Sequence, residues 1–464
     1  MLLAALVPGC STLSSVSDAV FGTGPAVGQA GNVSGFLGAV AADEPQAVLA
    51  ARNVLSAGGN AADAAVAGGL MLSVTLPSRA GLGGGGACLA YKAGKERGAV
   101  AEAIMFTALA PKSAAGSDRP AAVPMMARGL FALHARYGSR PFETLISPAE
   151  QAARFGLQTS RALARDIAVV AGPLAGDLTA AAVFLRNGTG LPEGAQLIQA
   201  ELGATLAQIR TAGVGDMYQG TLARKIVETT PFAGGALTLD DLRGAVPKLA
   251  PPLVLKTRGS DMVAFLPPPA DGGLAAAAAF QALRNPADAP AANARALSVA
   301  ASWRAGGGGD PVAAISAPDA AAPPLPALPA STTLATLDRD GNAVVCAFTM
   351  NNLFGTGRVA QQTGILLAAS PAWVPPALLS AAIAYNPNLL AFRAAVGGSG
   401  QAGAPIAAAF AMAQALAGDT AMPNPVPEPG RANAIACARY LPDNDASCSW
   451  ATDPRGAGLA AGSN

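Results

Sequence analysis

The sequence changes character abruptly at residue 331. Residues 285–330 are dominated by Ala, Pro and Gly, and residues 303–330 read WRAGGGGDPVAAISAPDAAAPPLPALPA. Because such a tract offers few bulky apolar side chains, it is predicted to be a surface linker outside any packed core. Directly after it, STTLATL (331–337) and AVVCAFTM (343–350) flank a turn at Asp340-Gly341-Asn342. This pattern predicts a β-hairpin that begins at Ser331.

The first residue of this hairpin, Ser331, would become more reactive if the chain were cut before it. A new N-terminus carries a free α-amine, and its reference pKa of about 7.7–8 suits it to accept the proton of the hydroxyl. The same hydroxyl can attack the preceding peptide bond and cut it through an ester. A Ser-Thr-Thr run after a Pro-rich tract is also an ordinary way to enter a strand, so the local residues leave both interpretations open.

Histidine chemistry is restricted, because His134 is the only histidine among 464 residues. This count rules out a multi-histidine metal site, and a Ser-His-Asp triad would need His134 itself. Its surroundings, GLFALHARYG (129–138), have a helical pattern and favour a structural role. The glycine run 83–86 lacks the following Lys-Ser/Thr of a phosphate-binding loop. No metal or cofactor is expected.

The composition excludes some broad classes of protein. Apolar residues make up 51 % of the chain, so a wholly disordered chain is excluded. The 30 basic and 29 acidic residues give a net charge of +1, which argues against a nucleic-acid partner. Past the N-terminus, no stretch approaches the ~18–20 unbroken apolar residues of a membrane-spanning helix.

The N-terminus and the cysteines point to export. Residues 1–35 are interpreted as a signal or lipoprotein segment and a linker, because Val7-Pro8-Gly9-Cys10 resembles a lipobox. A lipid anchor at Cys10, and a periplasmic or outer-envelope location, are therefore expected, with an ordinary N-terminus as the alternative. Cys437 and Cys448 are predicted to form a local disulfide. Cys88 and Cys346 lie in strand-like runs and are predicted to be buried thiols.

The region before the linker is expected to contain both helices and strands. A helix is predicted over 43–57, ending at Gly58-Gly59, and Asn60 and Asp63 form the pattern of an N-terminal cap for the next helix. Residues 120–245 are mostly helical in pattern, and residues 252–266 look extended.

A series of motifs along most of the chain resembles the γ-glutamyltranspeptidase family, of the N-terminal-nucleophile (Ntn) hydrolase type. The motifs are GGNAADAAVA (58–67), PSRAGLGGGG (77–86), VPMMARGLFALHARYG (123–138), DMYQGTLA (216–223), LTLDDL (237–242), LPPPADGG (266–273), DGNAVVCAFTMNNLFGTG (340–357), TGILL (363–367) and DPRGAGLAAG (453–462). The resemblance implies an α+β fold, a four-layer αββα sandwich with two antiparallel sheets between helical layers. It also implies a self-cleaving precursor with a large-subunit-like region, 36–330, and a small-subunit-like region, 331–464.

The resemblance also implies a set of site residues. The family's nucleophile stands nine residues before the Asp of the D-G-[NS]-A-V turn, which gives Ser331, with Thr332 as the alternative after a one-residue slip. Thr349 is expected to hydrogen-bond the nucleophile, and Asn351 to contact the substrate. The pair Gly397-Gly398 is expected to offer backbone groups near the oxyanion.

Two departures from the family pattern concern the substrate. Thr107 stands where the family has an Arg that pairs with the substrate carboxylate, and LLAASPAWVPP (366–376) replaces a segment with an acidic residue. Without these two charged anchors glutathione is not expected to be the natural substrate. The family's pair of oxyanion serines would fall near Ala377-Leu378, and their loss favours an inactive family member. Arg358 is a cation near the site that could replace the lost anchor, or it could be a solvated loop residue.

The expected function is that of a γ-glutamyltransferase-like, or glutathione hydrolase-like, self-processing amidohydrolase and acyltransferase. It would act on a small-molecule amide through an ester on Ser331, released by water or an acceptor amine, with the two fragments of its own chain as partners. One alternative is an acylase of the same family with a non-glutamyl substrate. Another is an uncleaved, inactive binding or structural protein of the envelope.

Overall fold

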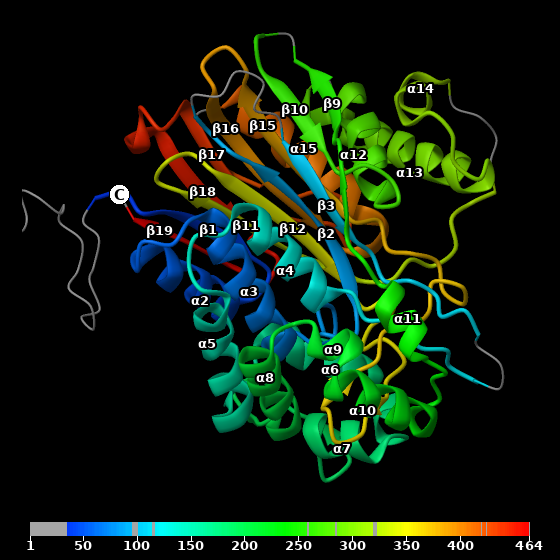
Figure 1. The fold of residues 1–464 in the computed structure, drawn as a ribbon. Helices are drawn as coiled ribbons and strands as arrows, with labels where there is room; N and C mark the ends of the chain where they lie inside the picture. Colours follow the sequence, from blue (N-terminus) through cyan, green and yellow to red (C-terminus); the bar gives the residue numbers. More distant parts are fainter. Residues whose placement is uncertain are drawn as a thin grey trace, which may run out of the picture.

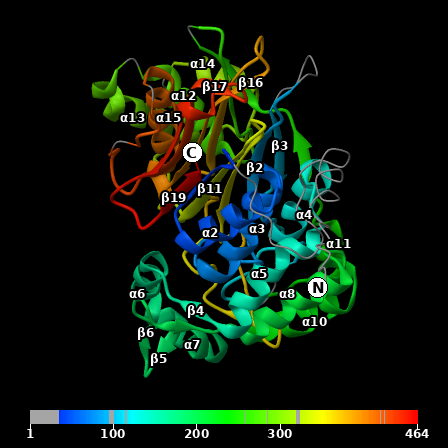
Figure 2. The ribbon, with the colours of Figure 1, turned by 90° about the vertical axis from the view of Figure 1, so that its left-hand side faces the viewer.

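The computed structural model describes residues 35–94, 101–113, 117–257, 259–283, 285–318, 323–418, 420–423 and 425–463. Two antiparallel sheets lie face to face in the middle of the molecule, and helices cover the outer face of each (Figures 1 and 2). The predicted four-layer αββα sandwich is therefore confirmed.

The first sheet has seven strands and carries the hairpin predicted from the sequence. Its order is β19 (Leu459–Ser463), β1 (Gly38–Ala42), β11 (Ser331–Asp338), β12 (Ala343–Thr349), β2 (Gly85–Tyr91), β3 (Glu102–Phe106) and β8 (Lys248–Ala250). The turn between β11 and β12 is held by Asp338, whose carboxylate accepts hydrogen bonds from the backbone of Asp340 and Asn342. The hairpin thus forms as expected and lies at the centre of the sheet.

The second sheet has six strands. Its order is β18 (Cys448–Thr452), β17 (Arg431–Leu441), β16 (Ala391–Ser399), β15 (Ser380–Asn386), β10 (Met262–Phe265) and β9 (Leu253–Lys256). Short two-stranded pairs lie outside the sheets: β4 (Leu157–Gln158) with β7 (Gln196–Leu197), β5 (Leu185–Arg186) with β6 (Thr189–Gly190), and β13 (Val359–Ala360) with β14 (Ile365–Leu366).

Helices from residues 45–244 cover the first sheet and extend below it in Figure 1. They are α2 (Pro45–Ser56), α3 (Ala61–Thr75), α4 (Met126–Tyr137), α5 (Phe142–Phe155), α6 (Arg161–Ala175), α7 (Leu178–Phe184), α8 (Ala200–Ala212), α9 (Asp216–Gln219), α10 (Thr221–Thr229) and α11 (Leu239–Gly244). The predicted cap of α3 is present, because Asn60 and Asp63 each accept a hydrogen bond from the other's backbone N–H. Every residue of α3 is buried, so this helix forms the centre of its layer.

Helices α12 (Asp271–Ala282), α13 (Ala289–Ala305), α14 (Pro311–Ser316) and α15 (Ala404–Ala417) lie on the side of the second sheet. The prediction of a linker without a packed core over 285–330 was wrong for α13. Ala292, Ala296 and Ala300 on α13 are fully buried and belong to the same apolar cluster as α12 and α15. Alanine has the highest helix propensity, and its small side chain lets helices approach closely. The Ala-rich composition therefore led to the wrong prediction that residues 289–305 lie outside the core.

The described residues contain two disulfides. Cys437–Cys448 joins β17 to β18, as predicted. The prediction that Cys88 and Cys346 are separate thiols was wrong, because they form a disulfide between neighbouring strands β2 and β12. Their separation of 258 residues hides this pairing from the sequence. The proposed lipobox at Cys10 lies outside the described residues.

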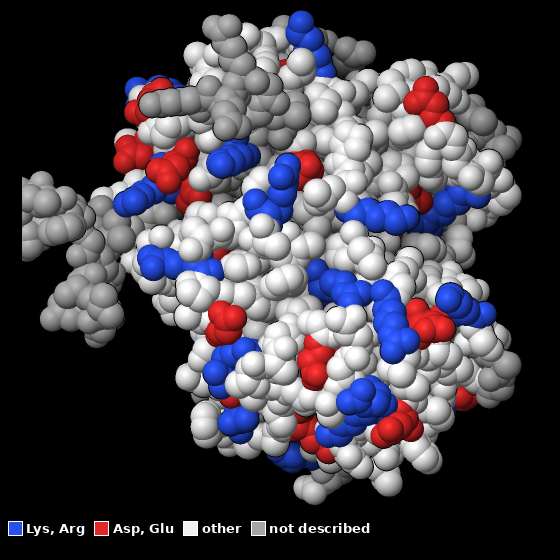
Figure 3. Space-filling model, viewed as in Figure 1, with Lys and Arg blue, Asp and Glu red and all other residues white. Residues whose placement is uncertain are grey.

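Charged side chains of both signs are interspersed over the face shown in Figure 3, between broad uncharged areas. This is the distribution expected from a nearly balanced count of 30 basic and 29 acidic residues. Within the part of the chain that the structure describes, none of the helices combines the length and the apolar character that crossing a membrane requires.

Candidate active site

Two of the residues expected at the site, Ser331 and Thr349, lie in one row across the first sheet, together with Thr107. Ser331, the first residue of β11, pairs with Thr349, the last residue of β12, and Thr349 pairs with Gly85 of β2. The next pair along β2 and β3 is Gly86 with Phe106, which puts Thr107 beside Gly85. Strands are about 4.8 Å apart, so Thr107 lies roughly 14 Å from Ser331 along this row.

The side chains of Ser331 and Thr349 point into the layer between the two sheets. Alternate residues of a strand face the same side, and Ala335 on β11 and Ala347 on β12 belong to the apolar cluster between the sheets. Ser331 lies on the same face of β11 as Ala335, and Thr349 lies on the same face of β12 as Ala347. The layer between the sheets is therefore apolar along most of β11 and β12 and contains hydroxyl groups at the end where Ser331 and Thr349 lie.

Thr349 contacts the peptide bond that precedes Ser331. The chain is continuous here, and the Thr349 hydroxyl donates a 2.9 Å hydrogen bond to the carbonyl oxygen of Ala330. The expected hydrogen bond between Thr349 and the Ser331 hydroxyl is absent among the described residues. The Thr349 hydroxyl is instead placed where negative charge would develop if the Ala330 carbonyl were attacked.

Ser331 is 1 % exposed, and its Oγ has no hydrogen-bond partner among the described residues. A buried hydroxyl without a partner is uncommon, and such groups often have a chemical role. Thr332, the alternative nucleophile, faces the helical layer, and its hydroxyl donates to Asp43 at 2.9 Å. The structure thus leaves the Ser331 hydroxyl unengaged beside the Ala330 carbonyl.

Asp43 and Asn433 surround the next residues of β11. Asp43 accepts hydrogen bonds from the Thr333 N–H at 3.1 Å and from the Asn433 side-chain amide at 3.0 Å. Asn433 also donates to the Thr333 hydroxyl, whereas its own Oδ1 has no partner among the described residues. Neither Asp43 nor Asn433 was predicted from the sequence. The strand-end position of Asp43 gave a weak signal, and the apolar run around Asn433 gave none.

Arg79 places a positive charge near Asp43. Its guanidinium makes two hydrogen bonds to Asp166, at 2.6 and 2.7 Å, and Ser78 donates to the same carboxylate. Burial acts to lower the pKa of Arg79, but Asp166, with a smaller contribution from Asp43, raises it above the ordinary value. The guanidinium therefore stays charged, and it ties the loop before the glycine run to α6.

Asn351 lies directly beyond β12, with a positive φ of 54° and an exposure of 4 %. Its backbone N–H donates to the Thr349 hydroxyl at 3.0 Å, and its side-chain amide donates to the Ala369 carbonyl at 3.1 Å. The structure thus brings Asn351 to the site. Its contact with a substrate remains a prediction.

Gly397 and Gly398 lie inside β16 and pair with residues of both β15 and β17. In such a ladder the N–H groups point along the sheet, and the expected role of this pair near the oxyanion stays a prediction. Gly397 also allows the sheets to approach, because a Cβ there would lie 2.6 Å from the Cβ of Thr333. This spacing brings β16 against the start of β11.

The family's two charged substrate anchors have no charged counterpart here, because half-buried Thr107 stands at the Arg position and residues 366–376 contain no acidic residue. At the positions of the oxyanion serines, Ala377 and Leu378 are buried apolar residues. Arg358 does not lie free near the site, because Asp118 holds its guanidinium through two hydrogen bonds of 2.6 and 2.8 Å. His134 contacts the Arg140 carbonyl at 2.6 Å, which fits the structural role predicted for it.

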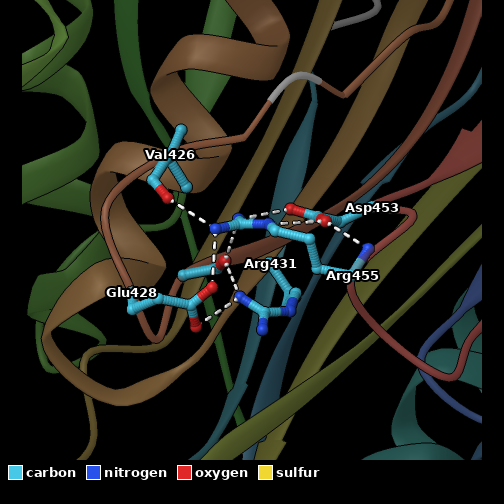
Figure 4. Close-up of polar contacts among 6 residues, drawn as sticks. Val426, Glu428, Arg431, Asp453 and Arg455 are labelled. Atoms are coloured by element: carbon cyan, nitrogen blue, oxygen red, sulfur yellow. Dashed lines mark hydrogen bonds and ion pairs between the residues drawn. The ribbon is translucent and has the colours of Figure 1, made fainter.

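A network of charged residues holds the start of β17 (Figure 4). Arg455 binds Asp453 and Glu428, and it donates to the carbonyls of Val426 and Gly430. Arg431 also pairs with Glu428, at 2.9 Å. Asp453 pairs with Arg455 at 2.7 Å, and Arg455 in turn holds the loop that leads into β17 through Val426 and Gly430.

Comparison with known proteins identifies the family. The model of the gamma-glutamyltranspeptidase family matches residues 47–305. This chain belongs to the gamma-glutamyltranspeptidase family. It is 30 % identical over 384 residues to the glutathione hydrolase proenzyme of Escherichia coli, which covers 71 % of this chain and 65 % of that protein.

Two further comparisons are with acylases. The chain is 30 % identical over 263 residues to the acylase ACY 1 proenzyme of Pseudomonas sp. (strain SE83), covering 52 % of this chain and 46 % of that protein. The structure of a cephalosporin acylase from Bacillus halodurans superposes with a TM-score of 0.73 at 20 % identity, over 94 % of this chain and 98 % of the other. This last likeness concerns the fold. The chain spans less than two thirds of the length of the curated relatives named here.

Proposed function

We propose that this member of the gamma-glutamyltranspeptidase family cuts itself before Ser331 and then acts as an amidohydrolase and acyltransferase. The observation that carries this proposal is the hydrogen bond from the Thr349 hydroxyl to the Ala330 carbonyl, beside the Ser331 hydroxyl, which has no partner among the described residues. These positions support the proposal, because the Thr349 hydroxyl can stabilise the oxyanion that an attack of Ser331 on Ala330 would create.

The proposed cut proceeds through an ester. The Ser331 Oγ attacks the carbonyl carbon of Ala330, and the peptide C–N bond breaks as the C–O bond forms. The proton of the hydroxyl passes to the departing nitrogen, which becomes the α-amine of Ser331. Water then hydrolyses the ester, which releases the Ala330 carboxylate and restores the hydroxyl.

In the cut enzyme the α-amine accepts the proton of the Ser331 hydroxyl as the latter attacks a substrate amide. The amide nitrogen leaves with a proton, and an acyl ester on Ser331 remains. Water or an acceptor amine then takes the acyl group. Thr349 donates to the acyl oxygen, and Asn351 contacts the substrate.

The acyl group itself distinguishes two candidate functions. A γ-glutamyl group is what the name of the Escherichia coli relative suggests. Thr107, which stands at the family's Arg position, and the segment 366–376, which contains no acidic residue, favour the second candidate, an acylase that accepts a less charged acyl group, as the name of the Pseudomonas relative suggests. Rates on a γ-glutamyl anilide and on neutral acyl anilides separate the two.

Self-cleavage is tested on a denaturing gel with thiol reductant, followed by N-terminal sequencing. The wild-type chain is expected to give two fragments, the smaller one starting at Ser331, and Ser331→Ala a single band. A new start at Thr332 would move the nucleophile by one residue. A single band for the wild type would contradict the proposal and favour an uncleaved binding or structural protein.

Export to an oxidising compartment is part of the proposal. The disulfides Cys88–Cys346 and Cys437–Cys448 support it, because such bonds persist outside the reducing cytosol. A lipid anchor at Cys10 in the periplasm or outer envelope is the finer form of this proposal. Processing that globomycin blocks would support the anchor, and insensitivity to globomycin would contradict it.

A further inference from the structure

Ser399, the last residue of β16, has a buried hydroxyl that the proposed reaction does not use. The side chain is 1 % exposed, and its Oγ has no hydrogen-bond partner among the described residues. Leaving a buried hydroxyl unpaired destabilises the folded state, because no hydrogen bond replaces the ones it made with water. A serine at such a place, next to a glycine pair, therefore needs an explanation.

The packing of the sheets places Ser399 opposite Ser331. Gly397 contacts Thr333, and Ser399 and Ser331 lie two residues further along their strands on the same faces. The direction of β16 is fixed at the other end of the layer. Tyr91 of β2 lies at that end, separated from the end of β11 by β12 alone. Its ring stacks on Tyr385 of β15, and Tyr385 pairs with Phe392 at the start of β16.

Because the start of β16 faces the end of β11, the end of β16 faces the start of β11. Three buried polar atoms without partners in the described structure thus belong to this end of the layer: the Oγ atoms of Ser331 and Ser399, and the Oδ1 of Asn433. Their clustering distinguishes this end from the apolar remainder of the layer.

The backbone around Ser399 is held firmly. Ser399 pairs with Arg431, which belongs to the charged network of Figure 4. Gly400 follows with a φ of 101°, and a Cβ there would lie 2.1 Å from the carbonyl oxygen of Pro429. A hydroxyl carried on such a support can orient a neighbouring group.

The nucleophile needs orientation because it is a serine. A threonine has a branched Cβ that restricts χ1, whereas a serine side chain turns more freely. We propose that Ser399 is a positioning residue whose hydroxyl donates a hydrogen bond to the Ser331 Oγ once the bond to Ala330 is cut. The Ser331 proton remains directed to its own α-amine. This inference rests on the proposed function, since it concerns the cut enzyme.

The experiment measures the reactivity of Ser331 without knowledge of the natural substrate. A fluorophosphonate probe is attacked at phosphorus by the Ser331 Oγ with loss of fluoride, and mass spectrometry follows the rate. Ser399→Ala is expected to lower the labelling rate about tenfold, the effect of a hydrogen bond worth ~1.4 kcal/mol. Ser399→Cys keeps the size but donates weakly, so it is expected to lose nearly as much.

The decisive comparison uses Ser331→Thr. With threonine as nucleophile its own methyl group restricts the rotamer, so adding Ser399→Ala is expected to change the labelling rate less than twofold. The matched control is Ser380→Ala. Ser380 is a buried serine of the same sheet whose hydroxyl donates to the Leu378 carbonyl, and it pairs with Gly398. Its loss is expected to leave the labelling rate unchanged.

The inference would be overturned if Ser399→Ala lowered the labelling rate equally in the wild-type and the Ser331→Thr backgrounds. It would also be overturned if Ser399→Ala or Ser399→Cys were labelled at the wild-type rate. Thermal melting confirms that the variants compared are folded. Failure of the proposed function has a different signature, because the wild type itself would then remain uncut and its Ser331 unlabelled.

Discussion

Cys88 and Cys346 form a disulfide across β2 and β12, and they lie on opposite sides of the Ala330–Ser331 bond in the sequence. Self-cleavage would leave Cys88 in the large fragment and Cys346 in the small one. The mature protein is therefore expected to be a covalently linked pair of fragments. Without reductant a denaturing gel should show one species of full mass, and with reductant two.

The second disulfide provides the control for this prediction. Cys437 and Cys448 both lie in the small fragment, so replacing both with Ser should leave the fragments linked. Replacing Cys88 and Cys346 with Ser should separate them on the gel without reductant. Separate fragments from oxidised wild-type protein would contradict the expected link.

Replacing Thr349 is expected to slow self-cleavage. Thr349→Val keeps the shape but removes the hydrogen bond to the Ala330 carbonyl, and the loss of one oxyanion donor lowers a rate roughly 10²–10³-fold. The variant should accumulate as full-length precursor in a time course on reducing gels. Thr349→Ser retains the hydroxyl and should cut at close to the wild-type rate. If Thr349→Val cuts as fast as Thr349→Ser, the hydroxyl has no role in cleavage.

The fold was predictable where the pattern is local. Alternation on both sides of Asp340-Gly341-Asn342 predicted the hairpin of β11 and β12, and Asn60 with Asp63 predicted the start of α3. Helix α13 was missed because its buried face consists largely of alanine, which looks the same on every face of an Ala-rich segment. The Cys88–Cys346 pairing depends on the order of strands in the sheet, which no local pattern reveals.

The candidate site likewise combines residues that a local pattern predicts with residues that only long-range packing brings there. Ser331 and Thr349 follow from the family pattern, and the hairpin makes them neighbours. Ser399 and Asn433 reach the site from the other sheet, and only the packing of two sheets brings them there. The sequence drew attention to Gly397 next to Ser399, but the reason for that glycine is close approach to Thr333.

Glu44 is expected to make stability depend on pH. Its carboxylate caps α2 by accepting from the Ala47 N–H and also accepts from the Thr75 hydroxyl, yet burial raises its pKa above the ordinary 4.5. The folded state therefore holds this proton more tightly than the unfolded state. The stabilisation is full below pH 4.5 and is lost as the pH rises through the folded-state pKa.

Glu44→Gln stays neutral at every pH and tests this expectation. In the uncut Ser331→Ala background, the melting temperature of Glu44→Gln relative to Glu44 should increase as the pH rises from about 4 to neutrality. It should then level off above the pKa of the folded carboxyl. Other titrating groups cancel in this difference. A difference that stays constant with pH, or declines, would show that Glu44 does not titrate in this way.

Thr107→Arg is expected to shift the enzyme toward γ-glutamyl substrates. Thr107 follows β3 beside Gly85 in the same row as Ser331, at the position where the family pattern has an Arg that pairs with the substrate carboxylate. A charge-assisted hydrogen bond contributes about 1.5–3 kcal/mol, so the ratio of kcat/KM for a γ-glutamyl anilide over a neutral acyl anilide should rise roughly 10–100-fold. Thr107→Gln adds length without charge and should change the ratio little. An equal effect of both variants would mean that position 107 acts through size, and that the carboxylate is recognised elsewhere.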